Sequence, residues 1–256
     1  MPELPVPDSE ETRPGLVGHR ILRFGIVDST NETAKVLLDE GIDDGTVVVA
    51  ERQAAGRGRH GRAWASPAGG LYVSIALATD PPALGPLSLI AGIPVVQAFR
   101  HFGVFAGLKW PNDVVFMEKK IGGILAEGVY RRDRFWAVVG LGVNTNVEVE
   151  RLPPDVRGTA TSLKREVDMF VSNEEFLDFL LGRFEDLYGR FRTGTRDRLL
   201  RDYRGLCGTI GQDVSVITST GKVRGRGWDI APNGALIVMD AAGTKHEIVD
   251  GTVERA

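Results

Sequence analysis

Four arginines lie in one short, glycine-rich stretch of the chain, residues 51–64. The four are Arg52, Arg57, Arg59 and Arg62. No acidic residue follows Glu51 within the stretch, although the chain as a whole carries a formal net charge of −3. Such a local excess of positive charge predicts a binding site for an anion. Because glycine allows unusual backbone conformations and close approach of a ligand, we predict a loop that is mobile when empty and closes over a phosphorylated ligand.

The glycines of residues 56–61 have the G-x-G-x-x-G spacing of a dinucleotide-binding fingerprint. That fingerprint requires a helix directly after the glycines, because the helix N-terminus faces the pyrophosphate. Pro67 and the pair Gly69-Gly70 follow instead, and they disfavour a helix. Side chains must then meet the phosphate charge, and the dinucleotide interpretation is disfavoured. A solvated basic loop would explain the arginines, but neither the glycine spacing nor the aromatic Trp64.

Two further groups of polar side chains stand next to predicted strands. Residues 29–31 form a polar corner at the start of a predicted helix, and residues 109–113, followed by Lys120, form a turn rich in functional groups. Pro-Asn-Asp is also ordinary turn chemistry. The sequence has neither a Cys/His set spaced for zinc nor a Ser/His/Asp constellation, and its four histidines are scattered. Cations and one aromatic therefore favour chemistry at phosphate, which depends on positioning and charge stabilisation.

The elements that position these groups are expected to form one mixed sheet. Strands are predicted over 21–27, 46–51 and 71–77, and the last two are apolar enough to be buried on both faces. The arginine loop is then a long excursion between two core strands, and such loops are usually functional or disordered. Ser29 and Glu32 have capping-box spacing and predict a helix that continues to about residue 40.

Helices and a hairpin follow further along the chain. Apolar spacing predicts a helix from 87 to about 102, kinked at Pro94, and then a strand over 104–108. A strand entered at Lys119 is expected to return as a hairpin through 135–139, and its two glycines, Gly122 and Gly123, would let a ligand lie against bare backbone. A second capping box, Ser172 with Glu175, opens a long helix, and a shorter helix ends near Tyr203.

The pattern changes near Gly205 to short strands separated by turns. The strands are predicted over 214–217, 223–230, 235–239 and 246–249. Asn233-Gly234 is a strong hairpin signal, and short strands without a helix predict a small barrel. We place a domain boundary there, which gives one domain over 1–205 and a second over 206–256.

Composition limits the class of protein. With 256 residues and 25% charged residues, the chain has the composition of an ordinary soluble globular protein. No apolar run approaches the roughly 20 residues that span a bilayer, and the acidic, proline-rich N-terminus is unlike a secretory signal. The single cysteine, Cys207, excludes an intramolecular disulfide and is interpreted as a small apolar residue. We expect a cytoplasmic protein that does not bind membranes.

Six motifs occur in the order found in biotin protein ligases, so that the chain resembles this family over residues 21–163. The motifs are Asp28-Ser29-Thr30-Asn31, Gly56-Arg57-Gly58-Arg59-His60-Gly61-Arg62, Lys109-Trp110-Pro111-Asn112-Asp113, Lys120-Ile121-Gly122-Gly123-Ile124-Leu125, Gly140-Leu141-Gly142-Val143-Asn144 and Ala160-Thr161-Ser162-Leu163. One departure is His60, where the family commonly has an arginine, and its role is left open. The resemblance implies an α+β fold: a mixed β-sheet flanked by helices, like the catalytic domain shared with class II aminoacyl-tRNA synthetases, and a small C-terminal SH3-like β-barrel.

The resemblance also implies a reaction in two steps. The biotin carboxylate attacks the α-phosphate of ATP, which releases pyrophosphate and leaves biotinyl-5′-AMP. A lysine of a carboxylase carrier domain, the biotin carboxyl carrier protein, then attacks this mixed anhydride. The first step brings two anions together, so it requires cations, and Mg²⁺ is expected to accompany ATP.

The resemblance assigns roles to residues of this chain. Residues expected to bind biotin are Ser29, Thr30, Asn31, Gln53, Gly56, Arg57, Lys120, Gly122, Gly123 and Gly142. Residues expected to bind ATP are Arg57, Arg59, Arg62, Trp64, Lys109, Asn112 and Asn144. Arg59, Lys120 and Asp113 are expected to be catalytic, and Asp113 is the candidate protein ligand for Mg²⁺.

General chemistry suits these assignments and also leaves alternatives open. Short hydroxyls and an amide match the neutral donor and acceptor groups of the biotin ureido ring, and an indole stacks on adenine. Ser29 could instead be only a helix cap, Lys120 only a solvated surface cation, and Trp64 only a core residue.

Two other functions are weighed against this one. A lipoate protein ligase has a related catalytic fold, but its arginine–glycine signature differs and the Lys-Trp-Pro-Asn-Asp turn favours biotin. A nucleic-acid-binding module would use the arginine loop and the barrel as a basic surface, yet the barrel shows neither interleaved aromatics nor a clear basic excess. Some family members carry an N-terminal helix-turn-helix. Fewer than thirty residues precede the Ser-Thr-Asn motif here, so we expect no DNA binding, and we expect a homodimer paired through the central sheet.

Limited proteolysis tests whether the arginine loop closes. An acyl-adenylate hydrolyses when water reaches it, so the loop is expected to close over the intermediate. Proteases should cut between Arg57 and Arg62 in the empty protein, and biotin together with ATP should suppress this cutting. Cutting that stays unchanged when both ligands are added would contradict closure.

Overall fold

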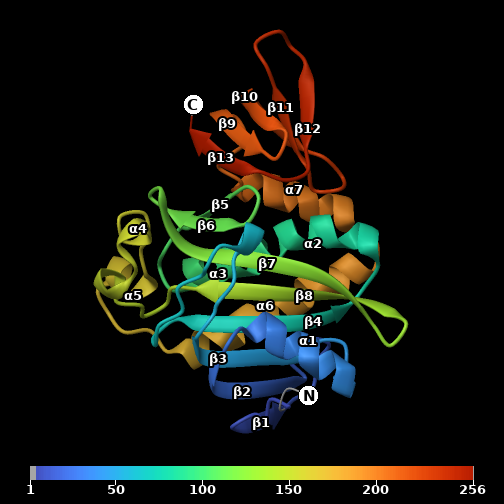
Figure 1. Ribbon diagram of the computed structural model, residues 1–256, viewed down its shortest axis with the longest axis vertical. Helices are drawn as coiled ribbons and strands as arrows, with labels where there is room; N and C mark the ends of the chain where they lie inside the picture. The colour runs from blue at the N-terminus through green and yellow to red at the C-terminus, as the bar shows by residue number, and fades with distance from the viewer. Residues whose placement is uncertain (1–3, 256) are drawn as a thin grey trace.

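A mixed sheet runs through the computed structural model, which describes residues 4–255. Within this part of the chain the sheet has eight strands in the order β1-β2-β3-β4-β8-β7-β6-β5 (Figure 1). The strands are β1 (Ser9–Thr12), β2 (Arg20–Val27), β3 (Val47–Gln53), β4 (Leu71–Ala78), β5 (Gly107–Lys109), β6 (Asp113–Phe116), β7 (Lys119–Arg131) and β8 (Arg134–Val143). Strands β2 and β3 are parallel, which requires a crossover, and the helix α1 (Thr30–Glu40) provides it.

Helices cover both faces of the large sheet. The first face packs against α1, and the second against α2 (Leu84–Ile90), α3 (Gly92–His101), α6 (Asn173–Arg192) and α7 (Arg196–Leu206). In β3, Val48 and Ala50 belong to the core on the α1 side, whereas Val47 and Val49 belong to the core on the other side. This alternation is the period of a strand, and it confirms that β3 is buried on both faces, as the apolar run predicts.

The C-terminal strands form a second, smaller sheet beyond α7 and β5 (Figure 1). They are β9 (Asp213–Thr218), β10 (Gly221–Ile230), β11 (Leu236–Met239), β12 (Lys245–Ile248) and β13 (Thr252–Arg255). The described strands pair antiparallel in the order β12-β11-β10-β9-β13, so the sheet is open and the predicted barrel is not confirmed. The short strands themselves are confirmed, as is the Asn233-Gly234 hairpin between β10 and β11, where Gly234 has a φ of 90°.

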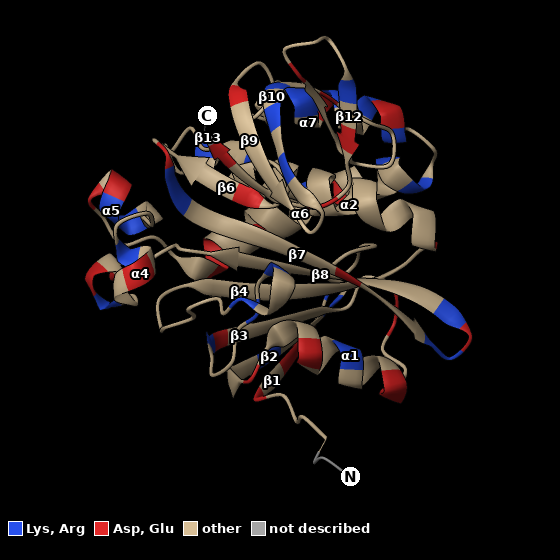
Figure 2. Ribbon diagram, turned by 45° about the horizontal axis from the view of Figure 1, so that its top comes forward, with Lys and Arg blue, Asp and Glu red and all other residues tan. Residues whose placement is uncertain are grey.

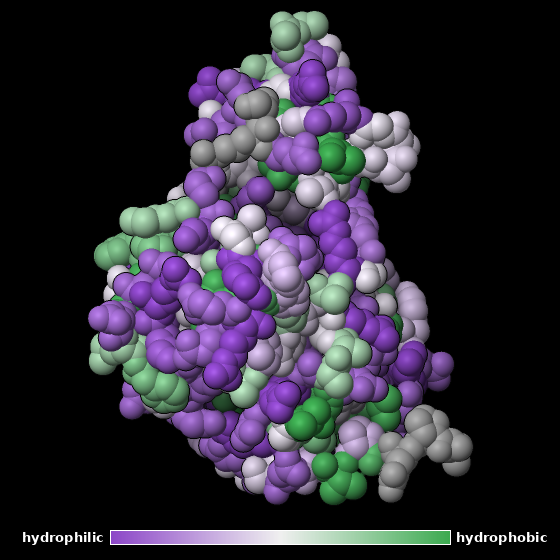
Figure 3. Space-filling model, turned by 60° about the vertical axis from the view of Figure 1, so that its left-hand side comes forward, coloured by the Kyte–Doolittle hydropathy of each residue, from purple (hydrophilic) through white to green (hydrophobic). Residues whose placement is uncertain are grey.

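One tryptophan ties the two sheets together. Trp110, which is 1% exposed, donates from its indole Nε1 to the carbonyl of Gly234 at 3.1 Å, and its backbone N–H donates to Thr209 Oγ1 at 3.0 Å. Cys207 is buried nearby, in agreement with its interpretation as a small apolar residue. The two sheets appear as two lobes of the surface, and the C-terminal lobe is the narrower (Figure 3).

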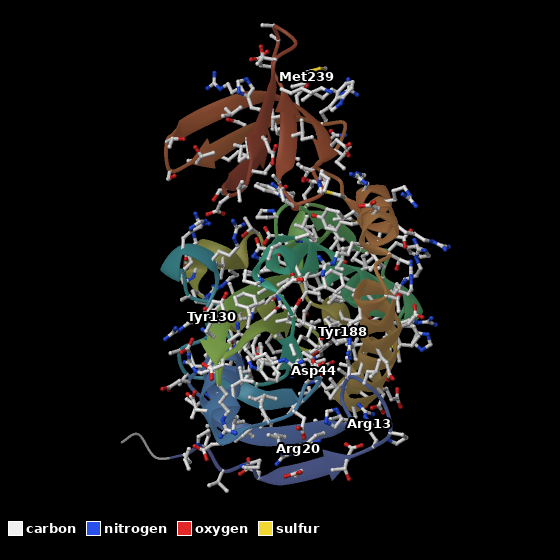
Figure 4. The ribbon with its side chains drawn as sticks, turned by 90° about the vertical axis from the view of Figure 1, so that its right-hand side faces the viewer. Arg13, Arg20, Asp44, Tyr130, Tyr188 and Met239 are labelled. Carbon is white, nitrogen blue, oxygen red and sulfur yellow. The ribbon has the colours of Figure 1, made fainter. Side chains whose placement is uncertain are left out.

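A partly buried polar pair links the long helix α6 to the loop that precedes β3. The hydroxyl of Tyr188 donates to Asp44 Oδ1 at 3.0 Å and contacts the carbonyl of Ala78, and the two side chains point toward one another in Figure 4. Burial raises the pKa of Tyr188, and the Asp44 carboxylate raises this pKa further. The tyrosine therefore stays protonated and remains a hydrogen-bond donor.

The helix predicted over 87–102 is two helices that meet at Ala91. Pro94 has no N–H to donate to the carbonyl of Ile90, which interrupts the helical hydrogen bonds at that point. Pro94 lies instead in the first turn of α3, where an N–H has no intrahelical partner.

The expectation that no apolar run reaches the length of a membrane span was wrong. Residues Pro81–His101 are long and apolar enough by composition, over 21 residues. In the structure 72% of the apolar window is buried, because this segment forms the core helices α2 and α3 against the sheet.

Three local predictions also differ from the structure. Ser29 occupies the N-cap position of α1, but its side chain makes no capping bond in the described structure, so the predicted capping box is absent. The N–H of Thr30 is instead bound by Gln53 Oε1 at 2.9 Å. The strand expected over 104–108 begins at Gly107, after a turn. Strand β1 was not expected, because all of its residues are exposed and show no alternation.

Replacing Phe176 by alanine should test the α3–α6 core. The Phe176 ring is fully buried and lies 5.3 Å from Phe99, centroid to centroid, so the Phe176→Ala variant should lose about 3–5 kcal/mol of unfolding free energy. Urea denaturation gives this value. The matched control is Phe170→Ala, at a side chain that is 70% exposed, and it should change stability by less than about 0.5 kcal/mol. An equal loss of unfolding free energy in both variants would contradict the packing of Phe176 between α3 and α6.

Candidate functional site

A cleft of about 300 Å³ opens between the large sheet, the arginine loop and the C-terminal sheet. Most of the residues predicted for the site line it: Ser29, Thr30, Asn31, Gln53, Arg57, Arg59, Arg62, Trp64, Lys109, Asn112, Asp113, Lys120, Gly123, Gly142 and Asn144. Gly56 and Gly122 lie just beneath the lining. A Cβ at Gly56 would be 2.5 Å from Ser66 Oγ, and one at Gly122 would be 3.1 Å from the Gly142 carbonyl oxygen. These two glycines therefore allow the walls of the cleft to pack.

A buried hydrogen-bond network holds the start of α1 against the sheet. Ser74 Oγ, in the middle of β4, lies 2.6 Å from Asn31 Oδ1 and 2.7 Å from Thr30 Oγ1. The Asn31 amide nitrogen donates to Glu127 Oε2 at 2.7 Å. Thr30 and Asn31 are thus fixed in position, whereas the Ser29 hydroxyl is not used as a helix cap.

Gln53 joins this network to the arginine loop. Its Oε1 accepts hydrogen bonds from the N–H and the hydroxyl of Thr30, at 2.9 and 3.2 Å. Its Nε2 donates to Ser66 Oγ at 2.6 Å. An amide nitrogen carries two N–H groups, so at most one of them is left for a ligand.

The arginine loop folds back on itself as a narrow hairpin. Arg57 bridges to Ala63, the N–H of Gly58 donates to the Arg62 carbonyl at 2.7 Å, and the N–H of Trp64 donates to the Gly56 carbonyl at 2.9 Å. The loop contains only the short turn η1 (Arg59–Gly61), and extended backbone follows it. The absence of a helix in this described segment confirms that the glycine spacing is not a dinucleotide fingerprint.

Trp64 lies on the bare backbone of two strands. A Cβ at Gly142 would be 2.6 Å from the Trp64 Nε1 atom, and a Cβ at Gly123 would be 3.2 Å from its Cζ3 atom. The Lys120 ammonium lies 5.1 Å from the indole centroid, within range of a cation–π interaction. Trp64 Nε1 is buried and finds no hydrogen-bond partner among the described residues. The indole thus occupies the space over Gly123 and Gly142.

Three cations of the site are each paired with a carboxylate. Lys120 Nζ lies 2.5 Å from Asp113 Oδ1, and Arg57 Nη1 lies 2.8 Å from Glu32 Oε1. Arg59 pairs with Asp250, from the turn between β12 and β13. An anionic ligand must therefore compete with carboxylates of the protein for these cations.

Arg59 is the most enclosed of the cations in the arginine loop. Its side chain is 22% exposed, and Nη1 lies 3.5 Å from Asn112 Oδ1. Burial lowers the pKa of Arg59, the Asp113 carboxylate raises this pKa, and Arg62 lowers it. A guanidinium starts from so high a pKa that Arg59 remains charged at neutral pH.

The remaining predicted residues lie at the rim and the floor. Lys109 ends β5, Asn112 lies in the turn between β5 and β6, and both line the cleft. The Asn144 amide donates to the Thr161 carbonyl at 3.0 Å and is buried, so it holds the neighbouring segment in place. Asp113 is the only acidic side chain in the lining of the cleft over the described chain.

Several residues of the site were not predicted. Ser74 and Glu127 support the α1 corner, and residues 251–253 of the C-terminal sheet complete one wall. A lone polar residue in the apolar run of β4 was a signal for Ser74 that sequence reasoning could have used. No comparable signal marks 251–253, because their place in the cleft depends on the docking of the second sheet.

The chain is similar to known proteins over most of its length. Residues 24–144 match the biotin/lipoate A/B protein ligase family model. Over 238 residues the chain is 35% identical to a biotin–(acetyl-CoA-carboxylase) ligase of Mycobacterium tuberculosis, covering 88% of this chain and 85% of that protein. It is 32% identical to the bifunctional ligase/repressor BirA of Bacillus subtilis, covering 90% of this chain and 72% of that protein.

A solved structure shares the fold over nearly the whole chain. It is a biotin protein ligase from Aquifex aeolicus in complex with biotin and ATP, with a TM-score of 0.80 and 30% identity. The match covers 92% of this chain and 99% of that one.

Replacing Gly142 by alanine should displace the Trp64 indole, because the added Cβ would lie 2.6 Å from its Nε1 atom. The indole anchors the arginine loop, so trypsin should cleave the Gly142→Ala variant at Arg57, Arg59 or Arg62 several times faster than the unchanged protein. The control is Gly182→Ala, in α6, where an added Cβ meets no described atom within 4 Å. Equal cleavage rates in both variants would contradict the anchoring role of Trp64.

Proposed function

The chain belongs to the biotin protein ligase family, and on that premise we propose how its cleft carries out the ATP-dependent ligase reaction. In the first step the biotin carboxylate oxygen forms a bond to the α-phosphorus of ATP, the bond to the β-phosphate bridge breaks, and pyrophosphate leaves. In the second step a carrier lysine nitrogen bonds to the biotinyl carbonyl carbon. The lysine loses a proton, the carbon–oxygen bond breaks, and AMP leaves.

The concentration of positive charge in the cleft is the observation that carries this proposal. The lining includes Arg57, Arg59, Arg62, Lys109 and Lys120, in a chain whose formal net charge is −3. A carboxylate and a polyphosphate repel each other at short range, and fixed cations in a partly enclosed cleft reduce this repulsion without reorganising during the reaction.

Biotin is proposed to bind at the α1 corner with its carboxylate toward Lys120. The Ser29 hydroxyl makes no capping bond, and Thr30 is held by Ser74 and Gln53. These polar groups suit the neutral ureido ring, which both donates and accepts hydrogen bonds. Lys120 would then stabilise the charge that develops on the carboxylate oxygen during transfer.

ATP is proposed to bind beside the arginine loop. Arg59 and Arg62 would bind phosphate oxygens, because guanidinium groups match phosphate geometry. Trp64 would stack on adenine. Asn112 and Lys109 would place the phosphates from the opposite rim.

The residues of the cleft fit a magnesium ion that is carried mainly by the nucleotide. Mg²⁺ in nucleotide sites commonly uses one or two protein carboxylates in addition to substrate phosphates, and Asp113 could supply one. Within the described residues no group of three or more His, Cys, Asp or Glu side chains is arranged to hold a metal alone. The ion would neutralise phosphate charge, and Lys120 would exchange its partner Asp113 for the biotin carboxylate.

The two alternative functions are less well supported. The named relatives from Mycobacterium tuberculosis and Aquifex aeolicus are biotin ligases, which disfavours lipoate as the substrate. A nucleic-acid-binding module would need a basic surface on the C-terminal sheet. Both signs of charge are mixed there (Figure 2), and Lys222 pairs with Glu254 at 3.2 Å.

Further properties follow from the family and remain part of the proposal. The carrier protein is proposed to be a carboxylase subunit. The chain would divide near Gly205 into a catalytic domain and a C-terminal domain of the SH3-like type, and it would act in the cytoplasm as a homodimer that binds neither DNA nor membranes.

Detection of the acyl-adenylate by mass tests the proposed function. The protein is incubated with ATP, Mg²⁺ and either biotin or lipoate, and only biotin should give the acyl-AMP. Arg59→Ala and Lys120→Ala should each lower the rate of adenylate formation by about 10²–10³-fold, the usual effect of losing one charge-stabilising group.

The control variant is Lys222→Ala, which removes a cation of the C-terminal sheet that pairs with Glu254. Its rate should match that of the unchanged protein. Formation of lipoyl-AMP in place of biotinyl-AMP would overturn the choice of substrate, and full activity of Arg59→Ala would overturn the role of the arginine loop.

A further inference from the structure

The C-terminal sheet contacts the arginine loop through one turn and the first residue of the strand that follows it. This turn, residues 249–251, joins β12 to β13. Asp250 pairs with Arg59, and Asp250 Oδ1 also lies 3.5 Å from His60 Nε2. Close by, Arg62 Nη2 donates to Thr252 Oγ1 at 3.2 Å. Three residues of the arginine loop, Arg59, His60 and Arg62, therefore contact a segment about 190 positions later in the chain.

Asp250 presents to Arg59 the same kind of group that a nucleotide would present. Carboxylate and phosphate oxygens both bind the forked N–H groups of a guanidinium. Arg59 has few other partners: its Nη1 lies 3.5 Å from Asn112 Oδ1, a long hydrogen bond. A phosphate that binds Arg59 must therefore replace Asp250 or share the guanidinium with it.

The position of Asp250 allows such a replacement. Its side chain is 53% exposed, whereas that of Arg59 is 22% exposed, so the carboxylate can return to water while the guanidinium stays in the cleft. Asp250 lies in a turn outside both strands, and releasing it breaks no pairing of β12 or β13.

The other two carboxylates paired with cations of the site belong to the large sheet and its first helix. Glu32 comes from α1, and Asp113 begins β6. Asp250 is the partner that comes from the C-terminal sheet. The contact therefore links the position of the C-terminal sheet to whether Arg59 is paired with Asp250 or with a phosphate.

We propose that Asp250 is an internal competitor for the nucleotide phosphate: it holds Arg59 in the empty protein, and ATP displaces it and frees the turn from the arginine loop. This inference rests on the proposed role of Arg59 in binding ATP. It also gives His60 a function, because the imidazole adds a second contact for the Asp250 carboxylate on the same loop.

Removing the competing charge should strengthen ATP binding. The Asp250→Asn variant keeps the size of the side chain and loses its charge, and it should bind ATP with Mg²⁺ about two- to fivefold more tightly, the range expected for a partly exposed ion pair. Calorimetric titration without biotin measures the affinity without turnover. Adenosine, which lacks phosphate, should bind the variant and the unchanged protein equally.

Glu254→Gln is the matched control, since Glu254 lies on β13 and pairs with Lys222 away from the loop. Its ATP affinity should not change. Asp250→Ser serves as a second variant with the same expected tightening, and melting temperatures show that each variant is folded.

The outcomes distinguish a failure of the Asp250 proposal from a failure of the proposed ligase function. The proposed competition would be overturned if Asp250→Asn and Asp250→Ser bound ATP no more tightly than the unchanged protein does. The proposal would also be overturned if the variants gained as much affinity for adenosine as for ATP. The pairing of Asp250 with Arg59 would then limit entry to the whole cleft and would not compete with phosphate. Failure of the unchanged protein to bind ATP at all would instead overturn the proposed function.

Discussion

The structure depends on holding several like charges close together at one end of a sheet. Unbalanced, the cations of the cleft would repel one another and destabilise the fold. Each of three is balanced by a carboxylate from a separate element: Glu32 of α1 for Arg57, Asp113 of β6 for Lys120, and Asp250 of the C-terminal turn for Arg59. At these three cations a substrate anion must exchange with a carboxylate, whereas Arg62 and Lys109 have no carboxylate partner among the described residues.

The sequence predicts much of the fold because its strongest patterns are local. The valines of β3 and the apolar run of β4 are each long enough to fill both faces of a strand, and glycine and arginine spacing marks the loop between them. The capping prediction failed because a residue distant in the sequence forms the expected hydrogen bond. Ser29 has the capping spacing, yet Gln53 binds the helix end in its place, and no local pattern can show that exchange.

The sequence predicted most of the residues that line the cleft, but not the residues that hold them in place. The motif residues come together in one cleft, whereas Ser74, Glu127 and the turn that carries Asp250 were missed. These residues act through hydrogen bonds and ion pairs across the fold, and their sequence neighbours carry no information about such contacts. Gly123 of β7 and Gly142 of β8 accommodate the Trp64 indole, and their contact with a ligand stays a prediction.

Trp110 has a consequence for motion within the molecule. Its indole donates a hydrogen bond to Gly234 in the C-terminal lobe, and Pro111 alone separates Trp110 from Asn112 and Asp113. The buried Trp110 ring therefore links the turn between β5 and β6 to the C-terminal lobe. A tilt of the smaller lobe that keeps this hydrogen bond would therefore shift Asn112 and Asp113 at the rim of the cleft.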